Sequence, residues 1–426
     1  MSADTTTTQV PALLKQVRET VAANDRWRGR TLNLIASENV LSPAARSVLD
    51  SDLLHRYAEG HPGGRYYEGT QYIDVIETEA AETMRRIFDA GWADVRPISG
   101  TVANEAVFSR IVPQGAPAIA HTVAGGGHIS HARIGSLGKR TKNILPWPTL
   151  EDGYTIDPAA ARDLIAKEKP AVIVLGRSLF LFPEPVADLR EVCSEAGTRI
   201  LYDGAHVLGL IAAGTFQDPL REGADALNGS THKTFFGPQR GVMLSPGTDE
   251  AFCKTLDKGV FPGSSSNHHL FSLPALLVSA LEVEAFGAAY ARKTIANAQA
   301  LGASLAKRGF HVAMADKGFT QSHQVAVDVS PYGGGKEVSA RLCDQDIVCN
   351  MNLLPGEPGK NAFNPSGVRL GVQEMTRFGM GTDEMDQVAD LMHAAVTNAR
   401  NIHEEVGALR DRFPDVQYGF QSADLD

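Results

Sequence analysis

Short apolar segments alternate with helical patterns from about residue 90 onward, and this alternation restricts the fold more than any other feature of the chain. Residues 173–176 (IVLG), 199–203 and 241–245 each have the composition of a buried strand. Asp157 followed by a proline is typical of a helix start, and Gly197 is typical of the residue that ends a helix. Strands separated by helices predict a mostly parallel, doubly wound sheet, which binds ligands at the carboxyl ends of its strands.

The flanking regions have a different pattern. Residues 1–9 are polar and predict a frayed tail, and a helical pattern follows over residues 10–30. Residues 310–314 and 324–329 alternate like antiparallel strands, and residues 383–400 have helical spacing. We therefore expect an α/β chain with an N-terminal arm (1–60), a large domain with a mostly parallel sheet (61–292) and a smaller C-terminal α+β domain (293–426).

Composition excludes several classes of protein. The chain has 426 residues, 43% of them hydrophobic, and a formal net charge of −10, which disfavours binding to nucleic acid or to an anionic membrane. The four cysteines form no C-x-x-C pair and no metal-type spacing with histidine, so we expect a reduced cytoplasmic protein without a metal site. The start has no signal-peptide character, and the longest apolar run, residues 273–281, is too short to cross a bilayer.

Two segments suggest chemistry on a carbonyl cofactor. Lys233 lies among small and polar residues in GSTHKTFFGPQRG, which we expect to join a helix to a strand. A lysine held out of bulk water can form an imine, although a lone loop lysine is more often a surface residue. Asp203 ends the strand in LYDGAHVLGL. An acidic group there could hold the ring nitrogen of a pyridine cofactor, or simply cap a helix.

Two further segments support this interpretation. Ser99, Gly100 and Thr101 precede a helix, where backbone N–H groups form a phosphate cradle, although a plain N-cap looks the same. His128 follows three glycines in GGGHISH, a pattern that suits an imidazole stacked on a flat ring and also an ordinary loop. The four segments together, in this order, predict a pyridoxal phosphate enzyme of the aspartate-aminotransferase-like class.

From about Leu32 to about Arg400 the chain resembles the serine hydroxymethyltransferases. The matching pieces are LIASENV, RYAEGHPGGRYYEG, SGTVAN, GGGHISH, DGAHVLGLIA, STHKT and SGVRLG. The resemblance implies a fold-type-I transferase that uses pyridoxal 5'-phosphate. Such an enzyme cleaves or forms the Cα–Cβ bond of a β-hydroxy amino acid and passes the one-carbon unit to a tetrahydropterin such as tetrahydrofolate.

The resemblance also implies roles for individual residues. Lys233 matches the lysine that binds the cofactor covalently, Asp203 the partner of its ring nitrogen, and His128 the histidine stacked on its ring. Arg369 and Ser37 match the groups that hold the substrate carboxylate, for which a guanidinium fork suits two oxygens. The other implied cofactor contacts are Tyr57, Ser99, Gly100, Thr101, Ser178, His206, Ser230, His232 and Gly263.

Some matching residues belong to the neighbouring subunit in this family, so the resemblance implies a homodimer or a tetramer. Tyr57, Glu59 and Tyr67 match residues lent in this way, and Glu59 and Tyr67 are also implied substrate contacts. Glu59 matches the candidate acid–base for the substrate hydroxyl. The implied catalytic residues are Lys233, Glu59, His232 and Tyr67.

Three departures from the common bacterial pattern leave the substrate open. The chain has FPGSSSNHH for a glycine-rich FPGGQGGP, so His268 or His269 could replace part of the phosphate contact expected near Gly263. It has SLFLFP after a strand, and GVQEMTRFGM after Arg369. These variants resemble the archaeal-type branch and its relatives, which include α-methylserine hydroxymethyltransferases and threonine transaldolases.

Ser230 stands where the common pattern has threonine, and the missing methyl suggests room for α-methylserine beside the default substrate, serine. A pterin-independent aldolase or transaldolase is the alternative enzyme. A non-catalytic RNA-binding relative is a third reading, and the intact Lys233, Asp203 and Arg369 argue against it.

Overall fold

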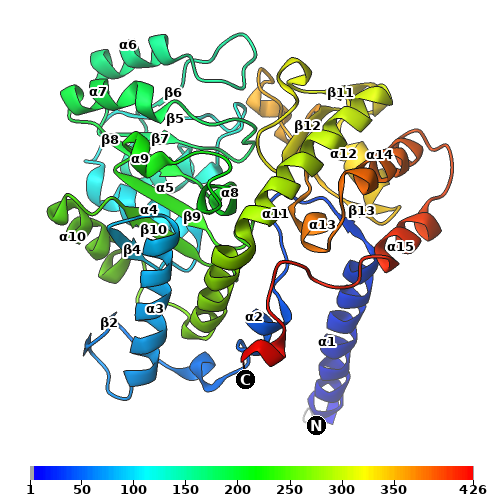
Figure 1. The fold of residues 1–426 in the computed structure, drawn as a ribbon, viewed down its shortest axis with the longest axis horizontal. Coiled ribbons are helices and arrows are strands. Elements are labelled where there is room, and N and C mark those ends of the chain that lie inside the picture. Colours follow the sequence, from blue (N-terminus) through cyan, green and yellow to red (C-terminus); the bar gives the residue numbers. More distant parts are fainter. Residues whose placement is uncertain (1–3, 426) are drawn as a thin grey trace.

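The computed structural model describes residues 4–425, and its longest helix, α11 (Leu273–Lys307), runs between two separate sheets (Figure 1). The larger sheet has seven strands in the order β4-β10-β9-β8-β7-β5-β6. Only β10 is antiparallel to its neighbours. The strands are β4 (Trp92–Asp94), β5 (Ala118–Ala120), β6 (Ile144–Pro146), β7 (Val172–Leu175), β8 (Arg199–Asp203), β9 (Ala226–Ser230) and β10 (Gly241–Ser245). The predicted α/β class with a mostly parallel sheet is confirmed.

Helices cover both faces of this sheet. Ile173 and Leu175 of β7 pack in one hydrophobic cluster, and Val172 and Val174 pack in another on the opposite face. The period of two places successive side chains on opposite faces, and this explains why buried parallel strands are apolar throughout. The helices of this part are α3 (Gln71–Ile87), α4 (Gly100–Ile111), α5 (Ser136–Arg140), α6 (Pro158–Glu168), α7 (Val186–Ala196), α8 (Leu208–Ala212), α9 (Pro219–Glu222) and α10 (Glu250–Lys258).

Local capping follows the sequence signals. The carboxylate of Asp157 accepts hydrogen bonds from the N–H groups of Ala159 and Ala160, and Pro158 occupies the first position of α6. Helix α7 ends at Gly197, whose φ of 69° lies in the left-handed region that favours glycine. Both predicted helix boundaries are confirmed.

The second sheet is antiparallel, in the order β11-β12-β15-β14. Its strands are β11 (His311–Val312), β12 (Gln324–Asp328), β14 (Asn350–Asn352) and β15 (Gly367–Gly371). Beside it lie α12 (Gly335–Cys343), α13 (Gln373–Arg377), α14 (Thr382–Val396) and α15 (His403–Asp411). Two short parallel strands, β1 (Leu32–Asn33) and β13 (Ile347–Val348), tie the N-terminal region to this part of the chain.

Three predicted boundaries were wrong. Helix α1 (Asp4–Arg30) begins at Asp4, so residues 4–9 of the predicted tail are helical, and residues 1–3 lie outside the described range. Extending an existing helix costs little per residue, which explains the difference. The predicted strand at 310–314 has only two paired residues, because Met314 adopts a φ of 58°. The closing helix ends at Val396 rather than near residue 400, and α15 follows as a separate helix.

Helix α11 packs in two hydrophobic clusters. Its residues Leu276 and Val283 belong to the cluster of the large sheet, whereas Leu301 and Leu305 belong to the cluster of the second sheet. The domain boundaries near residues 60 and 292 stay predictions. Among the described helices α11 has the length and hydropathy of a membrane span, but 61% of its most apolar window is buried inside the protein, as in a core helix.

A buried ion pair connects α13 to α11, and its removal should reduce the stability of the protein. Arg377 of α13 lies 3.0 Å from Glu282 of α11, and neither side chain is exposed to solvent. Removing one partner of such a pair leaves an uncompensated charge, at a cost of about 3–5 kcal/mol. We therefore expect Glu282→Gln to lower the free energy of unfolding, measured in urea, by an amount of this size.

The matched control is Glu284→Gln on the same helix. Glu284 pairs with Arg86, and the two side chains are 41% and 53% exposed. Water and salt screen such a pair, so its loss should change the free energy of unfolding far less. Equal losses in the two variants would contradict the assignment of Glu282 as the essential partner.

Candidate active site

Most of the predicted cofactor-binding residues meet at the carboxyl ends of β8 and β9. A cavity there is lined by Ser99, Gly100, Thr101, Asn104, His128, Arg177, Asp203, Ala205, His206, Ser230, His232, Lys233 and Gln239. The segment that carries Lys233 joins β9 to the antiparallel β10, so the expectation that a helix precedes it was wrong. The residues before it, Ala226–Ser230, pair with both neighbouring strands, and this pairing outweighs their local preference.

Asp203 is buried and forms three hydrogen bonds. Its Oδ2 accepts one from Asn104 Nδ2 (2.8 Å) and lies 2.9 Å from His131 Nε2, while its Oδ1 accepts one from the N–H of Ala205 (3.0 Å). Burial alone would raise the pKa of Asp203, but the bonds from His131 and Asn104 and the nearby His128 hold this pKa well below its ordinary value. The carboxylate is therefore ionised and suited to a protonated ring nitrogen.

Sequence reasoning missed two of these partners. Asn104 is the last residue of SGTVAN, and His131 is the last residue of GGGHISH, so both lay in motifs that had been singled out for other residues. The spacing gave a signal for Asn104: it lies one helical turn after Gly100 and therefore on the same side of α4.

Lys233 is only 7% exposed, and no hydrogen bond to its Nζ is formed by the described residues 4–425. Burial lowers the pKa of Lys233 to about 8; the carboxylate of Asp203 opposes this shift, and the guanidinium of Arg369 adds to it. A lower pKa increases the fraction of neutral amine near neutral pH. Lys233 therefore has the properties of an amine that attacks a carbonyl.

The start of α4 has the geometry of an anion site. Ser99 caps this helix of 12 residues, with its Oγ accepting from the N–H of Val102 at 3.2 Å. A Cβ at Gly100 would lie 2.5 Å from Ser230 Oγ, so the start of the helix and the end of β9 approach closely here. The first N–H groups of a helix have no partner within it and attract a phosphate. The cavity thus offers a phosphate cradle and a ring-nitrogen partner, and these features fit pyridoxal phosphate.

A neighbouring part of the cleft is cationic and apolar. It shares His128, His206 and Lys233 with the first cavity, and its lining adds Ser37, Val123, Gly126, Gly127, Ile129, Ser178, Met351, Asn352, Leu353, Ala362, Pro365 and Arg369. Arg369 of β15 donates to the carbonyl of Ser178 (2.6 Å) and to Asn350 Oδ1 (3.2 Å). Burial lowers the pKa of Arg369 to about 10, and no carboxylate among the described residues pairs with it. This guanidinium is therefore available to an anionic ligand.

Gln324 of β12, which gave no signal in the sequence, orients His206. Its Oε1 accepts from the N–H of Phe180 (2.9 Å), so its Nε2 is the group that faces His206 Nδ1 (2.9 Å). Burial and the nearby cations hold the pKa of His206 well below its ordinary value. The neutral ring therefore carries its proton on Nε2, which lies 3.4 Å from Arg369 Nη1. Two donors thus face one region, and an acceptor there would satisfy both.

The other two histidines of the cavity are also neutral. Burial lowers the pKa of His128 to about 4 and that of His232 to about 4, with Lys233 contributing to both shifts. His128, His131 and Asp203 offer ligand atoms within 4.8 Å of one another, a spacing that a metal ion could also use. The absence of a metal remains a prediction.

Other predicted residues do not line this cavity in the described part of the chain. Tyr57 and Tyr67 are 49% and 43% exposed, and Tyr67 Oη lies 3.4 Å from Glu59 Oε2. Glu59 precedes a short hairpin formed by β2 (Gly60–His61) and β3 (Gly64–Arg65). His268 is 1% exposed and bonded within its own subunit, so it is unavailable as a phosphate ligand.

The segment after α10 contains two more of the predicted residues, Gly263 and His269. Gly263 lies beside Arg110 of α4, away from the Lys233 cavity, and His269 is exposed. Both positions leave contact with a neighbouring subunit open.

Comparisons with known proteins agree with this geometry. The serine hydroxymethyltransferase family model matches residues 12–392. The chain is 46% identical over 411 residues to a serine hydroxymethyltransferase of Thermoplasma acidophilum, and 45% identical over 410 residues to one of Methanothermobacter thermautotrophicus. Each alignment covers 96% of both proteins.

A solved structure is similar as well. The crystal structure of L-threonine transaldolase from Pseudomonas fluorescens superposes with a TM-score of 0.89 at 26% identity, over 98% of this chain and 96% of that one. The expected fold-type-I architecture is thereby confirmed. Together, the family match and the relatives at about 45% identity show that the chain belongs to the serine hydroxymethyltransferase family, the pyridoxal phosphate-dependent enzymes that transfer a one-carbon group.

Proposed function

We propose that this protein is a cytoplasmic hydroxymethyltransferase that converts serine and tetrahydrofolate, or a related tetrahydropterin, into glycine and the one-carbon-loaded pterin. One observation carries the proposal: Lys233, with its pKa lowered to about 8, lies in one cleft with the ionised Asp203 and with Arg369, which no carboxylate of the described chain neutralises. When bound, pyridoxal phosphate supplies a sink for the electron pair released as the Cα–Cβ bond breaks.

The chain's own residues divide the work of holding this cofactor. The start of α4, at Ser99, Gly100 and Thr101, would bind the phosphate, and Asp203 would hold the ring nitrogen. His128 would lie against the ring, and Lys233 would form the covalent link. Contacts from Ser178, His206, Ser230 and His232 would complete the pocket, with Tyr57 and Gly263 supplied by a second subunit.

The cationic part of the cleft suits the amino acid and the pterin. Arg369 and Ser37 would bind the substrate carboxylate, and His206 Nε2–H would add a donor beside Arg369. Val123, Ile129 and Met351 also line this part and are 41%, 55% and 37% exposed, so they would offer apolar contacts to a pterin ring. A neighbouring subunit's Glu59, with Tyr67, would move the proton of the substrate hydroxyl.

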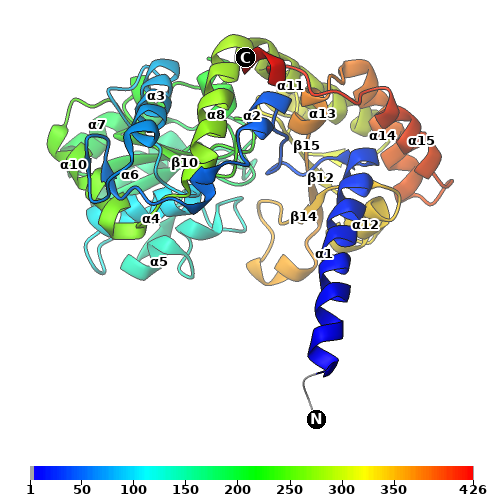
Figure 2. The ribbon, with the colours of Figure 1, turned by 90° about the horizontal axis from the view of Figure 1, so that it is seen from below.

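Two features support a homodimer. Helix α1 projects away from the rest of the molecule (Figure 2) and carries an exposed apolar stripe at helical spacing. The stripe consists of Val10, Leu13, Leu14, Val17 and Val21, with 52–67% exposure. An exposed apolar stripe of this kind is typical of an interaction site. The second feature is that Tyr57, Glu59 and Tyr67 would contribute to the active site of a second copy of the chain. A tetramer would pair two such dimers through a further surface.

Serine is the substrate that we propose first, and α-methylserine is the second. Ser230 lines the cavity with the start of α4 and is not among the described residues that line the part with Arg369. The missing methyl therefore lies nearer the cofactor phosphate than the substrate carboxylate. The similarity to L-threonine transaldolase keeps a pterin-independent transaldolase as the alternative function.

The direct test is an assay of the holoenzyme with serine, α-methylserine and threonine, each with and without tetrahydrofolate. We expect serine cleavage to require tetrahydrofolate, and α-methylserine to react about 10–200-fold less well in kcat/KM, since one methyl changes binding by about 1–3 kcal/mol. Equal rates without tetrahydrofolate, or a preference for threonine, would favour the aldolase or transaldolase.

Sharing of the site between subunits is tested by complementation. Lys233→Ala lacks the amine and Glu59→Gln lacks the acid–base group, so each homodimer should be nearly inactive. Refolding the two variants together should restore about a quarter of the wild-type activity, because half of the dimers then contain one intact site. No recovery, with mixed dimers present by mass spectrometry, would place both residues in the same subunit's site.

The role of Arg369 is tested by Arg369→Lys. A lysine cannot reproduce the two parallel bonds of a guanidinium to a carboxylate, so KM for serine should rise at least about 30-fold, or about 2 kcal/mol. Arg308→Lys, at an exposed pair with Asp386, is the control and should leave KM unchanged. An unchanged KM in Arg369→Lys would remove Arg369 from the carboxylate site.

A further inference from the structure

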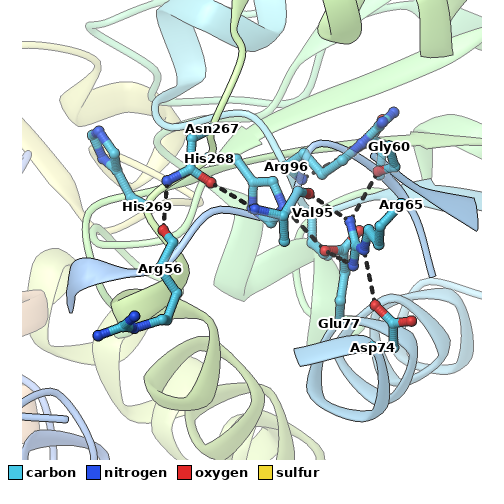
Figure 3. Close-up of polar contacts among 12 residues, drawn as sticks. Arg56, Gly60, Arg65, Asp74, Glu77, Val95, Arg96, Asn267, His268 and His269 are labelled. Atoms are coloured by element: carbon cyan, nitrogen blue, oxygen red, sulfur yellow. Dashed lines mark hydrogen bonds and ion pairs between the residues drawn. The ribbon is translucent and has the colours of Figure 1, made fainter. Parts of the chain in front are cut away.

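The segment FPGSSSNHH, which differs from the bacterial pattern, contacts the chain at Arg56, beside which Figure 3 shows Asn267. Asn267 Oδ1 accepts a hydrogen bond from the N–H of Ala58 (3.2 Å), and Asn267 Nδ2 donates to the carbonyl of Arg56 (2.9 Å). The side-chain amide therefore bonds to the backbone on both sides of Tyr57, as a neighbouring strand would.

Arg65 binds the backbone of the same segment on both sides of Glu59. Its Nη1 donates to the carbonyl oxygens of Ala58 (2.8 Å) and Gly60 (2.9 Å), which flank Glu59. Its side chain is 2% exposed and pairs with Asp74 and Glu77, each at 2.8 Å. The backbone on either side of Glu59 is thus fixed by a buried, fully paired guanidinium.

His268 anchors Asn267 to this network. Its Nδ1 accepts from Arg240 Nη2 (3.3 Å), and its carbonyl accepts from Arg240 Nη1 (2.6 Å). Its Nε2 lies 3.0 Å from Glu77 Oε2, although the geometry is not that of an aligned hydrogen bond, and burial lowers the pKa of His268. Glu77 also pairs with Arg65, so the braces on the two sides of the segment meet at one buried carboxylate.

The hydrogen bonds fall on alternate residues of this segment, at Arg56, Ala58 and Gly60, and the backbone of Arg56 is extended. Ala58 is fully buried, whereas Tyr57 is 49% exposed and Glu59 is half-buried. Successive side chains of an extended chain point to opposite sides, so bonds at residues 56, 58 and 60 determine where the side chains of Tyr57 and Glu59 point.

We propose that Asn267, anchored by His268, is a positioning residue that holds Glu59 in the orientation needed for proton transfer at the substrate hydroxyl. The proposal rests on the function proposed above, in which Glu59 serves a neighbouring subunit. Asn267 is not among the described residues that line either cavity of its own subunit, and it acts through the backbone of the Tyr57 segment. A displacement of about 1 Å at a reacting group can reduce a rate by about a hundredfold, so loss of this brace affects the rate more than binding.

The test compares Asn267→Ala with wild type as holoenzymes. We expect kcat for tetrahydrofolate-dependent serine cleavage to fall about tenfold while KM for serine changes little. Exchange of the α-hydrogen of glycine in D2O should stay at the wild-type rate, since glycine has no hydroxyl. Asn143→Ala, at an exposed asparagine before β6, is the matched control and should match wild type in both assays.

A double-mutant cycle with Glu59→Gln identifies the route of the effect. If Asn267 acts through Glu59, then Asn267→Ala should change the residual rate of Glu59→Gln by less than about twofold. An equal tenfold fall in both backgrounds, a fall in glycine exchange, or an unchanged kcat would overturn the proposal. Should Asn267→Ala fail to fold, Asn267→Asp, which keeps the acceptor for Ala58, takes its place with a smaller expected fall.

The two hypotheses fail differently. A wild-type enzyme without tetrahydrofolate-dependent serine cleavage would refute the proposed function. An active wild type with an unaffected Asn267→Ala variant would refute only the positioning role.

Discussion

The ionised carboxylate of Asp203, buried at the end of β8, is the constraint on which the arrangement of the site depends. Burying a charge is costly unless it is paired and hydrogen-bonded. The partners come from α4, from the loop that carries His131, and from the chain just after β8. Asn104 is oriented in turn by Asn228 Nδ2 of β9, which donates to its Oδ1 at 3.0 Å. These elements must therefore keep fixed positions relative to one another, because otherwise the buried charge of Asp203 would lose its hydrogen bonds.

The same constraint sets the dimensions of the cofactor site. Asn104, which contacts the carboxylate, and Ser99, which caps the helix, belong to one rigid element, α4. Ser99 and Asn104 are separated by little more than one turn of α4. This separation therefore determines the distance between the phosphate cradle and Asp203, the partner of the ring nitrogen. Lys233 lies in the segment just after β9, which ends at Ser230, and it lines the same cavity as Asp203 and the start of α4.

The substrate side of the cleft depends on contacts between the two sheets. Gln324 and Arg369, on the paired strands β12 and β15, both donate to the carbonyl of Ser178, at 3.1 and 2.6 Å. The second sheet thereby places a buried cation next to the cofactor pocket, and no carboxylate of the described chain neutralises it. An amino-acid carboxylate would supply the missing charge, so the electrostatics of the cleft favour an anionic ligand.

The sequence by itself determined the parallel sheet, the caps at Asp157 and Gly197, and the motifs around Lys233, Asp203 and Arg369, because these depend on short-range patterns and on family resemblance. It misplaced the start of α1 and the end of α14, where local propensity is weak. Only the tertiary structure decided the partners of those motifs. Gln324 meets His206 across 118 residues, and Asn267 meets Ala58 across 209, so no local pattern indicates either contact. A buried polar group needs a partner, but folding, not spacing in the chain, determines which residue supplies it.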